Sequence, residues 1–227
     1  MNTRFWSCLW IILKKDLKVE LRNKEIFATL GLFGLVLSFI FAFGFIGDPK
    51  TNLAVIPGIL WSGLLFTGAL SIGRTFSREQ ENQVFTALLL SPASRTALLN
   101  AKILINLILM IGSMILITPL IALLLHVDLT PYLGPLSLFL VLSCIGFAIV
   151  GTPLAVMAIN ARFPEVLLPM IVFPLITPIL ICGVRGCTAL FGTSTEIEYW
   201  SWIKLILAFD LTMWVGGFLL FDRMLEE

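Results

Sequence analysis

Long stretches without a single charged residue constrain this chain more than any other feature of its sequence. A helix needs roughly 20 mostly apolar residues to cross a bilayer. Five charge-free stretches approach or exceed that length, at residues 26–46, 53–73, 103–125, 129–161 and 166–184. A sixth stretch, 203–221, carries only Lys204 and Asp210. Pro131 and Pro135 open the longest stretch, so we place its helix near 134–158.

Six such helices in 227 residues leave little chain for another domain. Backbone groups cannot remain unpaired in lipid, so we predict an all-α polytopic membrane protein with six transmembrane helices. Residues 1–227 are expected to form a single transmembrane domain. Charged residues make up 13% of the chain, against roughly 25% in a soluble domain. The net charge of +1 leaves no basic surplus for binding nucleic acid.

The lysines and arginines predict the orientation, because cytoplasmic loops carry an excess of both. With the N-terminus inside, 12 of the 15 lie on the cytoplasmic side. These are Arg4, Lys14, Lys15, Lys18, Arg22, Lys24, Arg74, Arg78, Arg95, Lys102, Arg162 and Arg223. The outer side keeps Lys50, Arg185 and Lys204. Both termini are therefore expected in the cytoplasm.

The first 25 residues predict an amphipathic helix. Apolar side chains recur at helical spacing at Trp6, Trp10, Leu13, Leu17 and Leu21. Cations flank them at Lys14, Lys15, Lys18 and Arg22. This pattern is typical of an interfacial helix on the inner membrane surface, with its tryptophans at the level of the headgroups.

Residues 74–102 form the largest predicted cytoplasmic segment. Phe76, Val84 and Leu88 share one helical face, and the polar run SREQENQ occupies the early turns. Ser91-Pro92 should end this helix, and a second should run into the third span. The apolar face needs cover from lipid, from the bundle or from another protein.

The sequence lacks the motifs of the common catalytic and metal sites. His126 is the single histidine, which excludes the HExxH zinc site and a two-histidine haem clamp. Residues 68–75, GALSIGRT, differ from the phosphate-loop pattern at Arg74, and they end a membrane helix instead of following a strand. We therefore expect a non-catalytic chain without a metal site, and any ATP hydrolysis must occur on another chain.

Four further features lie within or beside the predicted spans. Asp210, at the centre of the sixth, should face the bundle or a wet cavity, near hydroxyls or a cation, because a charge in lipid is costly. Prolines at 169, 174 and 178 weaken the fifth helix, and the pattern leaves open whether the kink is static or moves. Cys182 and Cys187 could pair or remain free thiols. His126, Arg185 and Lys50 lie on the predicted outer side, and the sequence identifies none of them as the ligand of a cofactor.

Two stretches carry a resemblance to a known family. The first is 74–106, RTFSREQENQVFTALLLSPASRTALLNAKILIN, and the second is 162–184, RFPEVLLPMIVFPLITPILICGV. The most specific part of the first stretch is R-x-F-x-x-E-x-E, followed by LLLSP and a lysine. The most specific part of the second stretch is a helix that contains LLP, then FP, then a further proline. Together with the predicted spans, they resemble the haem exporter protein B family over essentially the whole chain. The family usually has glycine where this chain has Asn82.

The resemblance implies an ABC-2-type permease bundle in the bacterial inner (cytoplasmic) membrane, serving cytochrome c maturation. It implies a cytoplasmic ABC ATPase that binds ATP and docks on the 74–102 connector, with Glu79 and Glu81 at the family's paired acidic positions. The docking residues would be Phe76, Arg78, Glu79, Glu81, Val84, Phe85 and Leu88. Other maturation subunits in the membrane, and indirectly a periplasmic haem chaperone, would be further partners. It also implies that residues 185–200 dip back toward the membrane.

Haem is the cargo that this resemblance implies, and no covalently bound cofactor is expected. The residues do not decide whether haem passes through the chain or ATP only drives release of the haem-loaded chaperone. Two other functions remain open: an ABC-2 permease for another cargo, such as a drug or a glycan, and a proton-coupled secondary transporter. The latter usually needs paired ionisable groups at the midplane, where only Asp210 qualifies clearly.

Overall fold

The computed structural model describes residues 2–22, 25–44, 49–81, 95–158, 164–192 and 196–224, and every regular element in them is a helix. The first four helices are α1 (Asn2–Arg22), α2 (Glu25–Gly44), α3 (Pro49–Glu81) and α5 (Arg95–Leu124). A short 3-10 turn, η1 (Thr130–Tyr132), leads into α6 (Leu133–Ala158), α7 (Pro164–Phe191) and α8 (Glu196–Met224). The prediction of an all-α chain is confirmed.

Four of the described helices are long and apolar enough to cross a membrane. Their apolar spans are Asn52–Gly73, Thr96–Leu124, Thr130–Ala158 and Val166–Phe191. A fifth, shorter apolar helix covers Ala28–Gly44. The chain is thus a membrane helical bundle. The predicted sixth span at 203–221 lies inside α8, whose described part is not among these apolar spans, so the count of six remains a prediction.

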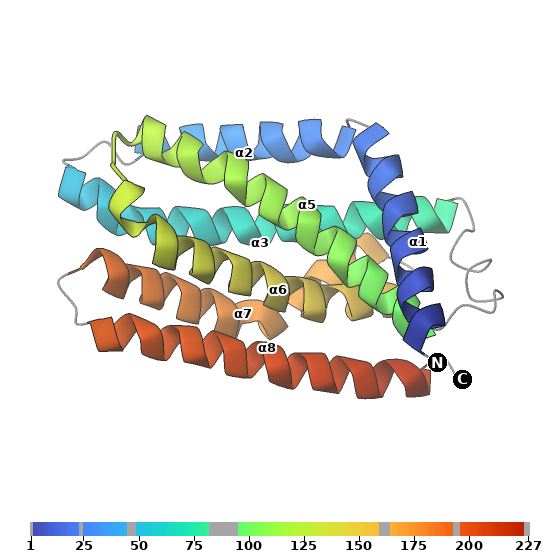
Figure 1. Ribbon diagram of the computed structural model, residues 1–227. Helices are drawn as coiled ribbons and strands as arrows, with labels where there is room; N and C mark the ends of the chain where they lie inside the picture. The colour runs from blue at the N-terminus through green and yellow to red at the C-terminus, as the bar shows by residue number, and fades with distance from the viewer. Residues whose placement is uncertain are drawn as a thin grey trace.

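The helices α2, α3, α5, α6, α7 and α8 run along a common axis, whereas α1 lies across one end of the bundle (Figure 1). The start of α5 and the end of α8 lie at this same end (Figure 1). Two helices organise the rest: α6 packs against α3, α5, α7 and α8, and α5 packs against α1, α2, α3 and α6.

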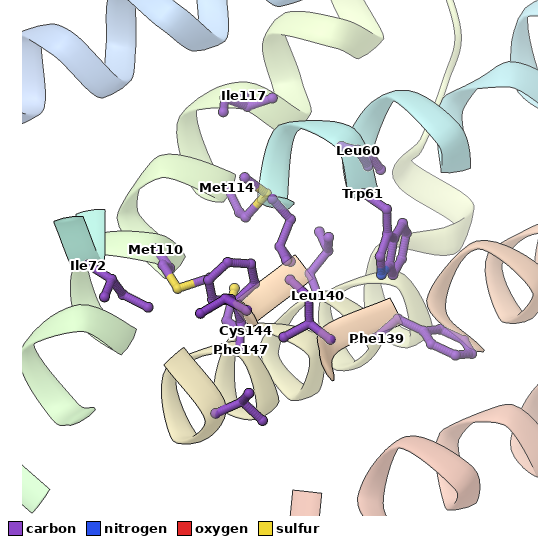
Figure 2. Packing of buried hydrophobic residues seen from close by; sticks show 14 of the residues in the cluster. Leu60, Trp61, Ile72, Met110, Met114, Ile117, Phe139, Leu140, Cys144 and Phe147 are labelled. Atoms are coloured by element: carbon purple, nitrogen blue, oxygen red, sulfur yellow. The ribbon is translucent and has the colours of Figure 1, made fainter. Parts of the chain in front are cut away.

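The core is centred on α6, which carries no charged residue and is apolar on all sides, as expected of a buried or spanning helix. Phe139 of α6 packs edge-to-face on Trp61 of α3, with ring centroids 6.5 Å apart (Figure 2). On the next turns, Phe147 points toward Met110 of α5 (Figure 2). The Trp61 indole also lies against Gly183 of α7, where a Cβ would overlap its ring. A small residue here lets two helices approach closely.

Three interhelical hydrogen bonds add direction to this packing. The Trp61 indole N–H donates to Ser143 Oγ on α6 at 3.2 Å. Asn106 Nδ2 on α5 donates to Thr152 Oγ1 on α6 at 3.1 Å. Such bonds are worth roughly 0.6 kcal/mol on average in membrane bundles. Asn52 Nδ2 on α3 donates to the Leu125 carbonyl at the end of α5 at 3.0 Å.

The region after the fifth span differs from what the resemblance implies. Residues 185–191 continue α7 without a break, and residues 196–200 open α8, so the described part of 185–200 contains no separate re-entrant segment. Pro169, Pro174 and Pro178 all lie inside α7, which stays a single α-helix through them. All four cysteines are free thiols, Cys182 and Cys187 included.

Candidate functional site

The predicted docking connector lies largely outside the described residues. The backbone of Phe76, Arg78, Glu79 and Glu81 is helical, because α3 continues from its apolar span to Glu81 without interruption. Their side chains, and the whole of Val84, Phe85 and Leu88, lie outside the described part. The docking assignment therefore stays a prediction. The structure does describe the two ends of the connector, at the end of α3 and at the start of α5.

The connector enters the bundle through the buried first turns of α5. Ala97, Leu98, Leu99 and Ala101 are each at most 3% exposed. Lys102 follows them and is only 2% exposed, which makes it one of the largest fully buried side chains in the described residues. A buried ammonium group requires a counter-charge or hydrogen-bond partners.

Asp16 of α1 supplies that counter-charge. Lys102 Nζ lies 2.6 Å from Asp16 Oδ2, and Asp16 is itself only 8% exposed. Lys15, whose side chain is 45% exposed, lies 3.1 Å from the other oxygen, Asp16 Oδ1. The short distance and the burial of both partners indicate a desolvated ion pair, which differs from the usual weak pair on a protein surface.

The two faces of α1 explain how Asp16 becomes buried. The face toward the bundle carries Leu9, Ile12, Leu13, Asp16 and Glu20, all buried. Leu13 packs with Ile105 and Leu109 of α5. Helical spacing puts these residues on one side, since positions three and four apart are neighbours. Sequence reasoning missed this face because it followed the tryptophan stripe.

Most of the predicted tryptophan stripe lies beside the packed face. Trp6 and Trp10 are 58% and 56% exposed, and Leu21 is exposed as well. Only Leu13 of the stripe is buried. The exposed members remain free to meet lipid, as the interfacial prediction requires. α1 is thus both an amphipathic helix and a helix packed on α5.

An apolar groove of about 640 Å³ lies where α1, α5, α6 and α8 meet. Trp6 of α1 and Trp214 of α8 line it, together with Ile145 of α6. Towards α6 and α8, the first turns of α1 therefore border open space. The main packing partner of α1 is α5.

Asp210 of α8 occupies a different environment inside the bundle. It is 5% exposed, and its carboxyl lies directly against Gly146 of α6, beside Ile179 of α7. A Cβ at Gly146 would overlap the Asp210 Oδ1 atom. Neither carboxyl oxygen has a hydrogen-bond partner among the described residues. No described hydroxyl or cation forms the hydrogen bond with Asp210 that the sequence led us to expect.

The segment after α5 holds the single histidine. His126 is exposed and adopts the left-handed conformation, with φ of 52°. Its N–H donates to the Leu123 carbonyl, and Val127 N–H donates to the Ala122 carbonyl, which is the Schellman pattern that ends a helix. His126 therefore acts as the C-terminal cap residue of α5. Arg185 is exposed on α7, and the Lys50 side chain lies outside the described residues.

Asp128 lies in the same segment, between α5 and η1. Its Oδ1 accepts hydrogen bonds from the Thr130 hydroxyl at 2.6 Å and the Thr130 N–H at 2.9 Å. These two bonds hold the pKa of the Asp128 carboxyl below its usual value of 3.8. In the residues that the structure covers, no three His, Cys, Asp or Glu side chains gather closely enough to hold a metal ion.

Comparison with known proteins identifies relatives over most of the chain. Residues 7–220 match the family described as CcmB protein. Heme exporter protein B of Haemophilus influenzae is 35% identical over 75% of this chain and 76% of its own length. Heme exporter protein B of Rhodobacter capsulatus is 31% identical, over 77% of this chain and 79% of its own length. The Paracoccus denitrificans protein of the same name is 28% identical over 77% and 80%.

Proposed function

Because this chain belongs to the CcmB family of haem exporter B proteins, we propose that it is the membrane permease subunit of an ABC-type haem exporter for cytochrome c biogenesis. The observation that carries this proposal is the family match over residues 7–220, which includes most of α1, the connector and most of α8. The bundle of long apolar helices supports it. The chain is a non-catalytic subunit, and a separate ATPase chain hydrolyses the ATP.

The proposed topology has six spans, formed by α2, α3, α5, α6, α7 and α8, in the bacterial inner membrane. Both termini lie in the cytoplasm, in agreement with the 12-to-3 distribution of lysine and arginine. The start of α5 and the end of α8 lie at one end of the bundle, where α1 crosses it, which supports this arrangement (Figure 1).

The partner ATPase docks on the connector between α3 and α5. The apolar span of α3 ends at Gly73, but the helix continues to Glu81, so it projects roughly 12 Å beyond the apolar part. That projection carries Phe76, Arg78, Glu79 and Glu81 out of the membrane toward a cytoplasmic partner. Val84, Phe85 and Leu88 supply the apolar contact, in the manner of an amphipathic helix in a groove.

Reversal of the paired acids tests this docking site. Glu79→Lys with Glu81→Lys should leave membrane insertion intact, while co-purification of the ATPase and ATP-dependent cytochrome c maturation are lost. The matched control is Glu196→Lys with Glu198→Lys, which has the same spacing and charge change on the proposed outer side. If the Glu79 and Glu81 variant retains both ATPase binding and maturation, the connector is a linker only.

The complex contains further membrane subunits of cytochrome c maturation, and a periplasmic haem chaperone receives the haem. Haem is the cargo of the complex. A purified complex in proteoliposomes distinguishes passage of haem from release of the loaded chaperone. ATP hydrolysis that rises with haem alone supports passage, and hydrolysis that rises only with the haem-loaded chaperone supports release.

A further inference from the structure

The buried ion pair between α1 and α5 lies close to the point where the connector enters the bundle. Lys102 follows Arg95, the first residue of α5, by only two helical turns. Its partner, Asp16, belongs to α1, which crosses this end of the bundle (Figure 1). Any displacement of the connector that moves the start of α5 therefore acts directly on the residue that holds α1.

The pair is the polar part of a one-sided attachment. α1 packs chiefly on α5, through Leu9, Ile12 and Leu13 around Asp16, while a groove separates its first turns from α8. Both partners of the pair are almost fully buried, so separation of α1 from α5 would take the Lys102 ammonium away from Asp16 and leave Asp16 with only the half-exposed Lys15 beside it. Separation of α1 from α5 is thus unfavourable, and the two helices are expected to move as one body.

α5 passes this motion on to the rest of the bundle. One turn after Lys102, Asn106 donates a hydrogen bond to Thr152 of α6. α5 also packs against α2 and α3 and touches α8, so together with α1 and α6 it is in contact with five other helices. In the N-terminal half of α1, the exposed Trp6 and Trp10 are suited to the lipid headgroup region.

We propose that Asp16 and Lys102 are positioning residues that fasten α1 to α5, so that movement of the connector shifts both helices together and couples ATP hydrolysis to the transmembrane bundle. This inference rests on the proposed function, because it takes the connector as the place where the ATPase acts. It assigns the α5 end of the connector as the route by which force enters the membrane.

The test uses the full complex in proteoliposomes and compares three variants. Asp16→Asn breaks the pair, Asp16→Lys with Lys102→Asp reverses it, and Asp16→Leu with Lys102→Met replaces it by apolar contact. ATPase co-purification, ATP hydrolysis and ATP-dependent cytochrome c maturation are measured for each. Hydrogen exchange of the α1 amides reports whether α1 stays packed on α5.

Asp16→Asn should keep the ATPase bound and active, raise hydrogen exchange in α1 and lower maturation per ATP hydrolysed by roughly tenfold. The reversed pair or the apolar pair should restore both slow exchange and coupling. Lys14→Gln serves as the control, because Lys14 is exposed on the same helix and its loss should leave coupling unchanged. Faster exchange in α1 with normal coupling would overturn the inference, as would lost coupling in a variant whose α1 exchanges as slowly as the wild type.

The two proposals fail in distinguishable ways. If the ATPase does not dock on the connector, the Glu79 and Glu81 reversal leaves it bound, whatever the Asp16 variants do. If α1 is only a passive part of the fold, the ATPase docks as proposed, and Asp16→Asn maintains the wild-type ratio of maturation to ATP hydrolysis.

Discussion

Asp16 on α1 and Asp210 on α8 are both buried, at 8% and 5% exposure, but their surroundings differ. Asp16 has the Lys102 ammonium at 2.6 Å, at the end of the bundle where the connector enters. Asp210 lies inside the bundle against the backbone of Gly146, with no hydrogen-bond partner among the described residues. Burial alone therefore does not determine what an acidic residue contributes to the stability of the fold.

The two regions differ in the cost of removing a charged group from each. Removal of one partner from a buried ion pair leaves the other as an uncompensated charge, which is far more costly than the loss of a surface pair. Removal of a group that has no hydrogen-bond partner leaves nothing uncompensated. At Asp210 the steric fit with Gly146 should matter more than the charge, whereas at Asp16 the charge should matter most.

The largest effect is expected from Lys102. Lys102→Met should lower the stability of the α1–α5 contact by up to about 3–5 kcal/mol, because the buried Asp16 then keeps only the half-exposed Lys15 as a counter-charge. Addition of Asp16→Leu should restore most of that loss. Thermal unfolding in detergent, combined with hydrogen exchange of α1, measures both variants. A Lys102→Met protein as stable as the wild type would show that Lys15 or solvent compensates the Asp16 charge, and the contrast with Asp210 would disappear.

A smaller loss is expected from an added methyl group beside Asp210. Gly146→Ala should destabilise the bundle by about 1–3 kcal/mol, because its Cβ overlaps the Asp210 carboxyl and approaches Ile179. Asp210→Ala should relieve part of this loss in the double variant. The matched control is Gly112→Ala on α5, where a Cβ has no neighbour within 4 Å. Equal melting temperatures for the Gly146 and Gly112 variants would contradict the close contact.

The sequence was sufficient to predict the helices, because exclusion of charge from lipid is a local property of each stretch. The stretch beginning at Pro131 illustrates this: we predicted a helix near 134–158, and α6 covers Leu133–Ala158. Helices such as α3 and α7 extend beyond the predicted spans, since composition marks where a span is apolar and not where the backbone stops being helical.

The partners of the buried acids could not be predicted in the same way. Asp16 and Lys102 are 86 positions apart, and Lys14, Lys15 and Lys18 all lie closer to Asp16 along the chain. The alignment of Leu9, Ile12 and Asp16 on one face was an available signal, but the tryptophan stripe beside it was more conspicuous. For Asp210, the rule that an intramembrane acid needs a polar partner favoured a hydroxyl or a cation, and the close approach of Gly146 depends on how α6 and α8 pack.

A near-neutral result is expected from Asp210→Asn. The change keeps the shape of the side chain and breaks no hydrogen bond among the described residues, so stability should stay within about 1 kcal/mol of the wild type. Melting temperature and cytochrome c yield are the measurements. Full function in this variant excludes a proton-coupled role for Asp210. A loss as large as that of Asp16→Asn would instead indicate a partner for Asp210 in another subunit.

The smallest effect is expected from Asp128, an exposed acid that serves as a reference for the two buried ones. Its hydrogen bonds to Thr130 lower its folded-state pKa below 3.8, so they stabilise the fold above that pH, and the contribution disappears as the pH falls through the folded value. Asp128→Asn should therefore melt slightly below the wild type near pH 6, and the difference should close below about pH 4. Melting curves of both proteins from pH 3 to about pH 6 provide the measurement. A difference that widens as the pH falls would show that the carboxylate is not the form that Thr130 stabilises.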